Sequence, residues 1–242
     1  IMSELLLNDR IIGGLSVEDT ELACNFYKTF VKSQLHATDA RTAEMCKLTE
    51  NSFRDVNIAY ANELSMLCEN LEIDVWELIS LANKHPRVNI LRPSAGVGGH
   101  CIAVDPWFLI HAAGGQAKLV ETARLQNDYK TEWAVAKIAK VAEEFSNVNL
   151  REPIIACMGL AYKENSDDLR ESAAIKIYKS LDALGLNVVG VEPNLNHHDD
   201  FNLQSYNNIN DIADIFVFLV KHDHFLGLKI NGIVVDFCGL DK

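Results

Sequence analysis

Apolar side chains recur at helical spacing through most of the first 150 positions. The segment 39–71 contains no glycine or proline, and its apolar residues return every three or four positions, which predicts one long helix. Similar periodic runs predict helices over 73–83 and 116–145. Closer to the start, a loop leads into a short strand within 7–14, and Ser16 precedes an acidic turn typical of a helix N-terminus.

Beyond residue 150 the pattern changes to short, continuous apolar runs. One helix is predicted over 170–185, where Gly185 supplies the terminator. Buried strands are predicted on both sides of it, over 153–159, 186–193, 214–220 and 232–237. Strands that alternate with helices favour a parallel sheet, so we predict an α/β protein whose last part is a Rossmann-like domain.

Composition and charge narrow the possible partners. The chain carries 22 Lys and Arg residues against 34 Asp and Glu residues, a net charge of −12, which repels nucleic acid and anionic membranes. No apolar run approaches the roughly 20 residues that span a bilayer, and the acidic first residues do not form a signal peptide. We therefore expect a cytoplasmic protein with no nucleic-acid and no membrane partner. A few converging basic side chains could still bind a small phosphorylated ligand.

The sequence GVGGHCIAVDPW, residues 96–107, follows a stretch of extended and turn character and concentrates the candidate chemistry. Its glycines resemble the dinucleotide fingerprint G-x-G-x-x-G, which joins a strand to a helix. Here Gly96, Gly98 and Cys101 occupy the three positions, and Pro106 follows where a helix should already be running. We therefore reject a dinucleotide fingerprint, although the glycines would still let backbone N–H groups approach a sugar closely.

A metal site is the second interpretation of this segment. His100 and Cys101 are neighbours and have no partners at ligand spacing. The stretches NHHDD (196–200) and KHDHF (221–225) are interpreted as solvated loop histidines. The six cysteines form no C-x-x-C pair, a pattern typical of free thiols in a reducing compartment. We therefore expect no metal and no disulfide framework.

A nucleophilic cysteine is the third interpretation. Most cysteines are small buried hydrophobes, and five of the six have apolar surroundings, whereas Cys101 is flanked by glycines, a histidine and Asp105. A thiol with an ordinary pKa near 8.5 is only slightly ionised at pH 7, so a catalytic Cys101 needs a cation or aligned N–H groups nearby. Lys47, Asn51 and Arg54 fall on one face of the long helix and could supply them; a solvated polar stripe is the alternative.

Four stretches of the chain occur in the same order in one enzyme family. They are TAEMCKLTENSFRDVNIAYANEL, HPRVNILRP, GVGGHCIAVDPWFL and GLAYKENSDDLRES. Through them nearly the whole chain resembles the UDP-glucose/GDP-mannose dehydrogenase family, and within it the enzymes that oxidise UDP-N-acetyl-mannosamine. The resemblance implies a fragment, inactive alone, in which 1–36 is a remnant of an N-terminal NAD-binding domain. It implies a helical central dimerisation domain with the cysteine loop over 37–147, and a Rossmann-like UDP-sugar-binding domain over 148–242.

Members of this family use NAD to oxidise the primary alcohol of a UDP-sugar twice, which gives a uronic acid for surface polysaccharide synthesis. The resemblance implies that Cys101 adds to the intermediate aldehyde and carries the thioester from which water releases the acid. Lys47 and Asn51 would stabilise the alkoxide and oxyanion, and Asp105 would accept protons or orient water. The implied cofactor is NAD, the implied substrate is UDP-N-acetyl-mannosamine, and the implied assembly is a homodimer through the central helices.

The same resemblance assigns the binding residues, each of which could otherwise belong to a surface ion pair. Substrate contacts are expected from Tyr162 and Lys163, from Arg92 and Gly98 in the loop around the sugar and phosphates, from Arg54 and, across the subunit boundary, from His85 and Arg87; Arg170 is expected to contact NAD. Two departures from the family pattern are a serine in RPSAGVGG and the lack of an arginine directly after VVD. The second leaves one late basic contact unassigned.

Two alternatives to this function remain open from the sequence. The first is the same oxidation of UDP-glucose or of another UDP-N-acetylhexosamine. The second belongs to a different class: a non-enzymatic dimer that binds UDP-sugars without NAD.

Overall fold

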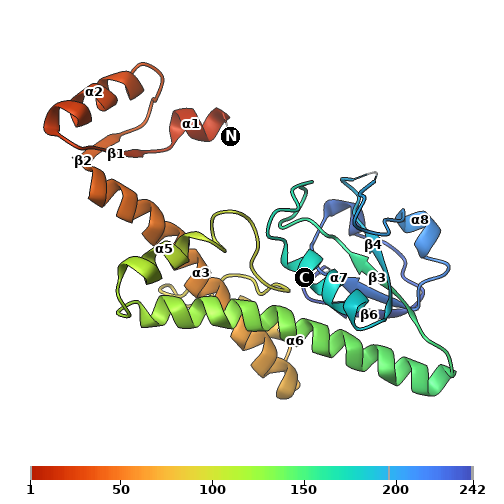
Figure 1. The fold of residues 1–242 in the computed structure, drawn as a ribbon. Coiled ribbons are helices and arrows are strands. Elements are labelled where there is room, and N and C mark those ends of the chain that lie inside the picture. Colours follow the sequence, from red (N-terminus) through yellow and green to blue (C-terminus); the bar gives the residue numbers. More distant parts are fainter. Residues whose placement is uncertain (1, 196, 241–242) are drawn as a thin grey trace. The chain divides into compact units, whose positions relative to one another are not determined.

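The computed structural model describes residues 2–195 and 197–240, and its elements are labelled in Figure 1. The chain divides into two compact units, Ile1–Phe53 and Arg54–Lys242. Within the part of the chain that is described, no helix combines the length and the apolar character needed to cross a membrane.

The first unit pairs two short strands and packs one helix against them. Its elements are α1 (Met2–Leu7), β1 (Arg10–Gly14), α2 (Val17–Tyr27) and β2 (Leu35–Asp39), and the two strands run parallel. The predicted helix N-terminus at Ser16 is confirmed: its side chain accepts the N–H of Asp19, whose carboxylate accepts the N–H of Ser16. The strand within 7–14 is confirmed as well. Neither α1 nor β2 was predicted, because each is too short to show a periodic apolar pattern.

Four helices follow. They are α3 (Ala40–Asn70), α4 (Val75–Ala82), α5 (Asp105–Ala112) and α6 (Lys118–Asn149). The predictions of helices over 39–71, 73–83 and 116–145 are confirmed. The expectation that Pro106 excludes a helix at this point is wrong, because α5 begins at Asp105. Proline is tolerated in a first helical turn, where its missing N–H would have had no partner within the helix.

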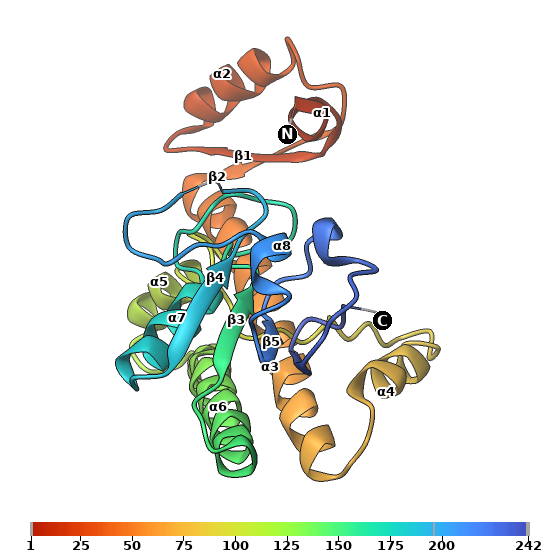
Figure 2. The ribbon, with the colours of Figure 1, turned by 90° about the vertical axis from the view of Figure 1, so that its right-hand side faces the viewer.

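The predicted parallel sheet is confirmed. Its strands are β3 (Ile154–Met158), β4 (Asn187–Val191), β5 (Ile215–Phe218) and β6 (Ile233–Asp236), in the order β4-β3-β5-β6, and all neighbours run parallel (Figure 2). The helix α7 (Ala173–Ala183) connects β3 to β4, while α8 (Tyr206–Ile209) and the 3₁₀ helix η1 (Asp223–Phe225) flank β5. This sequence of strand, helix and strand is the Rossmann-like arrangement expected from the apolar runs.

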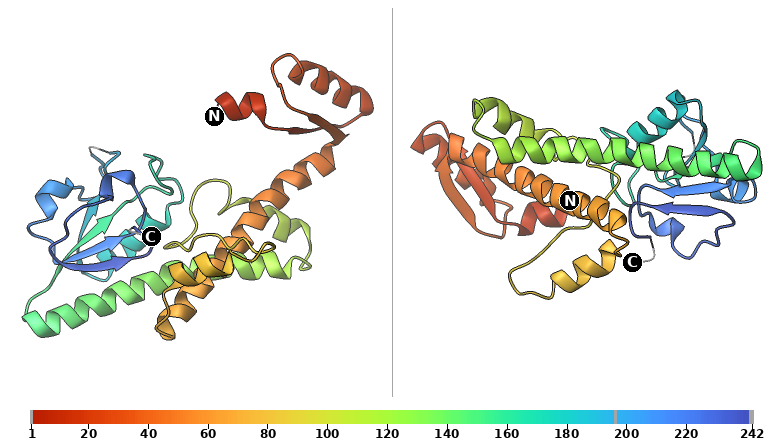
Figure 3. Two further views of the ribbon diagram at one scale, coloured as in Figure 1. Left: turned by 180° about the vertical axis from the view of Figure 1, so that it is seen from behind. Right: turned by 90° about the horizontal axis from the view of Figure 1, so that it is seen from below.

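Alternate residues of each strand pack into two separate cores on opposite faces of the sheet. On one face, Ile155 and Val217 pack with residues of α6 and α7, and Figure 3 shows α6 running past both α3 and α7. On the other face, Phe216 and Phe218 pack with residues of α8 and η1. Because both faces are covered, the strands are mostly apolar, which is why they were visible in the sequence as continuous runs.

Buried polar side chains join α3 to α6. Arg124 of α6 donates to the Asp55 carboxylate of α3 at 2.6 Å, and Asn127 donates to the same carboxylate at 2.9 Å. Two turns along α3, the side chain of Asn62 donates to that of Asn127 at 2.9 Å and accepts the backbone N–H of Ser94 at 2.8 Å. The network therefore fixes the two helices against each other and anchors the segment that precedes residues 96–99.

Lys130 of α6 is buried against α3, with 2% of its surface exposed. Its ammonium donates to the Ser65 hydroxyl at 2.8 Å and lies 3.7 Å from the centre of the Trp133 ring. Burial of the charge, followed by repulsion from Lys137, lowers the pKa of Lys130 to about 7.

We expect Lys130→Met to change how stability depends on pH. Because the folded pKa lies below the ordinary value, the unfolded chain binds more protons between pH 7 and about 10, so the burial cost present below pH 7 is relieved as pH rises. Relative to Lys130→Met, the wild-type free energy of unfolding should rise by about 3 kcal/mol between pH 7 and 9.5. Urea titrations at several pH values measure this. Exposed Lys140→Met is the control, and parallel pH profiles for wild type and Lys130→Met would contradict the prediction.

Candidate active site

A cavity of about 650 Å³ opens at the carboxyl ends of β3, β5 and β6. Its walls come from the loop after β3, from the residues that follow β5, from α3, and from the glycine segment (residues 96–99). The chain leaves β3 for β4 on one side and reaches β5 on the other, so the cavity lies at the point where strand order reverses. Its size is that of a site for a small organic ligand.

Gly98 and Gly99 bring the backbone of the glycine segment against Tyr162. A Cβ at Gly98 would lie 2.6 Å from the carbonyl oxygen of Glu171, and one at Gly99 would lie 2.8 Å from the Tyr162 ring. Gly99 also has a φ of 86° and donates its N–H to the carbonyl of Arg170 at 3.2 Å. Larger residues would separate the two walls, so these glycines are needed for the shape of the cavity.

The N-terminus of α7 faces the same cavity, where Ala173 and Ala174 form part of the lining. Ser172 caps this helix by accepting the N–H of Ile175 at 3.3 Å, and its hydroxyl donates to the carbonyl of Leu160 at 2.7 Å. The partial positive charge at a helix N-terminus favours an anionic group on the ligand.

Cys101 lies one turn before α5, with its carbonyl accepting the N–H of Asp105 at 2.8 Å, and it lines the cavity as a partly exposed residue. Hydrogen bonds to the Asp168 carboxylate raise the pKa of Arg170, and the Tyr162 and Cys101 groups raise it further. The carbonyl of Arg170 accepts the N–H of Gly99 at 3.2 Å, so Arg170 lies beside the segment that leads to Cys101. The expected contact of Arg170 with NAD stays a prediction.

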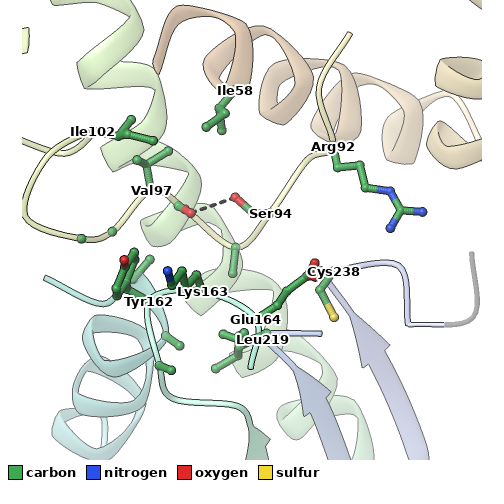
Figure 4. Close-up of a pocket in the computed structure, with 18 of the residues that line it drawn as sticks. Ile58, Arg92, Ser94, Val97, Ile102, Tyr162, Lys163, Glu164, Leu219 and Cys238 are labelled. Carbon is green, nitrogen blue, oxygen red and sulfur yellow. Dashed lines mark hydrogen bonds between the residues drawn. The ribbon is translucent and has the colours of Figure 1, made fainter. Parts of the chain in front are cut away.

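Half of the twelve site residues predicted from the sequence line the cavity. These are Arg54, Arg92, Gly98, Cys101, Tyr162 and Lys163. Figure 4 shows Tyr162 and Lys163 on the loop after β3, below the segment that carries Val97, with Arg92 at the far end of that segment. Residues more than 100 positions apart thus meet in one place.

The other nominated residues do not line this cavity. His85 and Arg87 are exposed in the turn after α4, and Arg87 donates its N–H to the His85 ring at 3.3 Å. Lys47 and Asn51 belong to the first unit: Lys47 is exposed, Asn51 is fully buried, and their side chains are 3.5 Å apart. Their placement beside Cys101 stays a prediction.

One basic residue that lines the cavity was missed by the sequence analysis. Lys221 follows β5 directly, lines the cavity and donates to the carbonyl of Gly239 at 2.7 Å. The signal was present in the sequence, because a basic residue at the carboxyl end of a buried parallel strand points to a ligand site. Lys221 therefore offers a positive charge at the part of the site where the late basic contact had no candidate.

The interpretation of KHDHF as a solvated stretch is wrong for one of its histidines. His222 is 0% exposed, and its ring lies between the Glu192 carboxylate and the backbone of Asn165. His197, in the other stretch, is exposed. Within residues 2–195 and 197–240, no three His, Cys, Asp or Glu side chains gather as metal ligands would.

The fit to NAD is limited to one residue. Across the described ranges, the glycines that end or follow a strand and precede a helix are Gly13 and Gly14, the last two residues of β1, and Gly159, after β3. A Cβ on either of the first two would meet backbone atoms within 2.6 Å, and one on Gly159 would meet Val220 at 2.7 Å. These glycines therefore serve close packing and do not leave a cradle for a dinucleotide. The exposed guanidinium of Arg170 is the candidate contact.

Comparisons with known proteins agree on one family of proteins. Sequence models described as "UDP-glucose/GDP-mannose dehydrogenase family, central domain" and "UDP-glucose/GDP-mannose dehydrogenase family, UDP binding domain" match residues 41–129 and 156–238. The chain is 49% identical to an NDP-N-acetyl-D-galactosaminuronic acid dehydrogenase of Ralstonia nicotianae, over 99% of this chain and 58% of that protein. It is also 49% identical to a UDP-N-acetyl-D-mannosamine dehydrogenase of Campylobacter jejuni, over 98% of this chain and 59% of that protein.

A solved structure of a UDP-D-ManNAc dehydrogenase from Pyrococcus horikoshii superposes with a TM-score of 0.89 and 37% identity. The match covers 100% of this chain and 59% of that chain. The chain thus spans about three fifths of the length of these relatives.

We expect two cysteines of the cavity to differ in reactivity. Cys101 and Cys238 both line it, but burial and the nearby Asp236 carboxylate raise the pKa of Cys238, so that thiol forms little thiolate. During iodoacetamide treatment at pH 8, Cys101 should be alkylated at least ten times faster than Cys238, as measured by a mass-spectrometric time course. Cys157, at 0% exposure, is the unreactive control. Equal rates at Cys101 and Cys238 would contradict this account of the cavity.

Proposed function

Because this chain belongs to the UDP-glucose/GDP-mannose dehydrogenase family, we propose that it forms the UDP-sugar-binding and cysteine-bearing part of an NAD-dependent UDP-N-acetyl-mannosamine 6-dehydrogenase. The observation that carries the proposal is the meeting of Cys101, Tyr162 and Lys163 in one cavity at the reversal of strand order. The product is the corresponding uronic acid, an acidic sugar for surface polysaccharide.

The charges around the cavity support a diphosphate ligand. Arg54, Arg92, Lys163 and Lys221 all line it, in a chain whose net charge is −12. Charged groups within a few ångströms outweigh a distant background that salt screens over about 8–10 Å. The N-terminus of α7 adds a partial positive charge on the same side.

The ring and backbone elements of the cavity support a nucleotide-sugar rather than a free phosphate. Tyr162 presents an aromatic face beside Gly98 and Gly99, and the Lys163 ammonium lies 5.4 Å from that ring. An aromatic surface next to a cation suits a sugar-linked diphosphate, because apolar sugar faces pack on rings while phosphates need cations. Residues that contribute to the site of a partner subunit must lie outside the cavity of their own chain. His85 and Arg87 meet this condition, because neither lines the cavity.

Cys101 supplies the nucleophile in this proposal. Oxidation at C6 of the sugar first gives an aldehyde, and its hydrate or an adduct is needed before a second oxidation. The Cys101 thiolate adds to the aldehyde carbon, and the thioester that results from the second oxidation is hydrolysed by water to the acid. NAD, when bound, accepts the hydride in both oxidations.

Three further residues of this chain act on protons and charge in the proposed reaction. Lys47 and Asn51 lie one helical turn apart on α3, and their cationic and amide groups stabilise an oxyanion. Asp105, one turn after Cys101, orients water or accepts its proton. Arg170 is proposed to contact NAD from the edge of the cavity.

A homodimer through the central helices belongs to the same proposal. Tyr60 and Leu67 lie seven positions apart on α3, and Leu71 directly follows its last residue; they expose 53%, 48% and 65% of their surfaces. Leu125 and Tyr129 of α6 are similarly exposed. Such apolar stripes on long helices are typical of surfaces that a second copy covers.

The relatives differ in the sugar that their names give. The two curated relatives have equal identity to this chain, and their names give different amino sugars. UDP-N-acetyl-mannosamine is the proposed substrate, and another UDP-N-acetylhexosamine or UDP-glucose is the alternative. Product analysis by mass spectrometry with each UDP-sugar distinguishes them, and oxidation of UDP-glucose alone would overturn the first choice.

We expect the chain itself to bind UDP, and Lys163→Met to weaken that binding. Losing one charge-assisted hydrogen bond to a phosphate costs about 1.5–3 kcal/mol, so the Kd measured by calorimetry should rise by at least tenfold. Lys140→Met, an exposed change on α6, should leave the Kd unchanged. Equal affinities for wild type and Lys163→Met would remove Lys163 from the site.

We expect Cys101→Ser to abolish acid formation in the protein extended to the length of its relatives. A hydroxyl is a much weaker nucleophile than a thiolate, so the variant should bind the UDP-sugar normally and release no uronic acid. NADH absorbance follows the oxidation, and the mass of the product shows whether uronic acid is released. Cys46→Ser, in the first unit, is the control. A wild-type protein that binds UDP-sugars but never reduces NAD would instead establish the non-enzymatic binding dimer.

A further inference from the structure

The loop that joins β3 to α7 carries Tyr162 and Lys163 to the cavity without regular secondary structure of its own. Asn165 closes its first part with a φ of 52°, in the left-handed region that asparagine tolerates better than most residues. A loop of this kind needs contacts from outside itself to keep one conformation.

Glu192 provides such contacts from beneath the loop. It follows β4, and its side chain is 0% exposed. One carboxylate oxygen, Oε2, accepts the backbone N–H groups of Leu160 and Ala161 at 2.8 and 3.0 Å and the His222 Nε2–H at 3.1 Å. The other, Oε1, accepts the backbone and side-chain N–H groups of Asn194 at 3.1 and 3.2 Å. Five donors thus surround one buried carboxylate.

His222 holds the other end of the same stretch. It follows β5, its side chain is 0% exposed, and its Nδ1 accepts the backbone N–H of Asn165 at 3.0 Å. Because Nδ1 accepts, the proton of the neutral ring is on Nε2, where it is donated to Glu192. Asn165 also accepts the N–H of Asp223 through its side chain at 3.0 Å, which ties the loop to η1.

Glu192 and His222 therefore bind the loop on both sides of the residues that reach the cavity. Glu192 binds the backbone at Leu160 and Ala161, His222 binds it at Asn165, and Tyr162 and Lys163 lie between these points. Burial by itself raises the pKa of Glu192, but hydrogen bonds from His222 and from the backbone lower it overall, so the carboxylate is ionised near neutral pH. Moving the loop would strip donors from a buried charge, which is costly.

We propose that Glu192 and His222 are positioning residues of the UDP-sugar site, which hold Tyr162 and Lys163 toward the ligand while His222 is neutral. This inference rests on the proposed function for the identity of the ligand. Neither side chain lines the cavity, so both act through the loop.

Protonation of His222 would disturb this arrangement. A proton on Nδ1 would point at the N–H of Asn165 and at the amide of Asn194, which lies 3.3 Å from the same nitrogen. The charged group that faces the ring is Glu192; Asp223 and Lys221 adjoin His222 in sequence, and the Phe225 ring of η1 packs edge-on at 5.5 Å.

UDP titration calorimetry on the whole chain tests the positioning role. His222→Leu removes both hydrogen bonds and should raise the Kd for UDP about tenfold. His222→Asn keeps an oxygen near the position of Nδ1, so it should rescue part of the loss. His224→Asn, an exposed change in η1, is the matched control and should bind as wild type. An unchanged Kd in His222→Leu would overturn the proposal.

Hydrogen exchange separates this inference from the proposed function, because it needs no ligand. In His222→Leu, amides of residues 160–165 should exchange faster while β3 and β5 stay protected. Equal acceleration in the strands would show a general support of the sheet and overturn the positioning role. Failure of the wild-type chain to bind UDP would overturn the proposed function, and the exchange result would still decide whether the pair holds the loop.

Discussion

The buried ion pair between Asp55 and Arg124 is the contact on which the helical wall of the cavity depends. The two side chains are 0% and 1% exposed and meet at 2.6 Å. Burial raises the pKa of Asp55 to about 6 against the attraction of Arg124, so the carboxylate is charged above that pH and must keep its partners. Because a buried charge without a partner costs several kcal/mol, α3 and α6 are held in the register that pairs these two charges. Through Asn127 and Asn62 this register reaches the backbone at Ser94.

The opposite wall of the cavity is built by the same physical means. The loop after β3 rests on the Glu192 carboxylate, as the segment before the glycines rests on the polar groups between α3 and α6. In both places a buried, hydrogen-bonded polar side chain, the Glu192 carboxylate or the Asn62 amide, fixes backbone that has no regular secondary structure. Apolar packing alone would hold the sheet and helices together but would leave these loops several conformations of similar energy. Gly98 and Gly99 then allow the two walls to meet at Tyr162.

The charge of the cavity shows how a local arrangement can oppose the composition of the whole chain. Basic residues from α3, from the segment before the glycines and from the ends of β3 and β5 converge, although acidic residues outnumber basic ones. Parallel strands make this convergence possible, because all of their carboxyl ends lie at one edge of the sheet. Arg170 lies beside the glycine segment, and its guanidinium pairs with Asp168 at 2.6 Å.

The sequence by itself determined the long helices, the parallel strands and six of the residues that line the cavity. Uninterrupted periodicity over 39–71 and apolar runs after 150 are local properties of the chain, and the shared motifs identified Cys101, Tyr162 and Lys163 directly. Only the tertiary structure decided that Arg170 lies beside the glycine segment, that Lys221 joins the site, and that His222 is buried against Glu192. Those contacts join residues that are far apart in the sequence, and whether a histidine in KHDHF is solvated or buried depends on what packs over it. No local pattern encodes that, because burial is a property of the fold and not of the neighbouring residues.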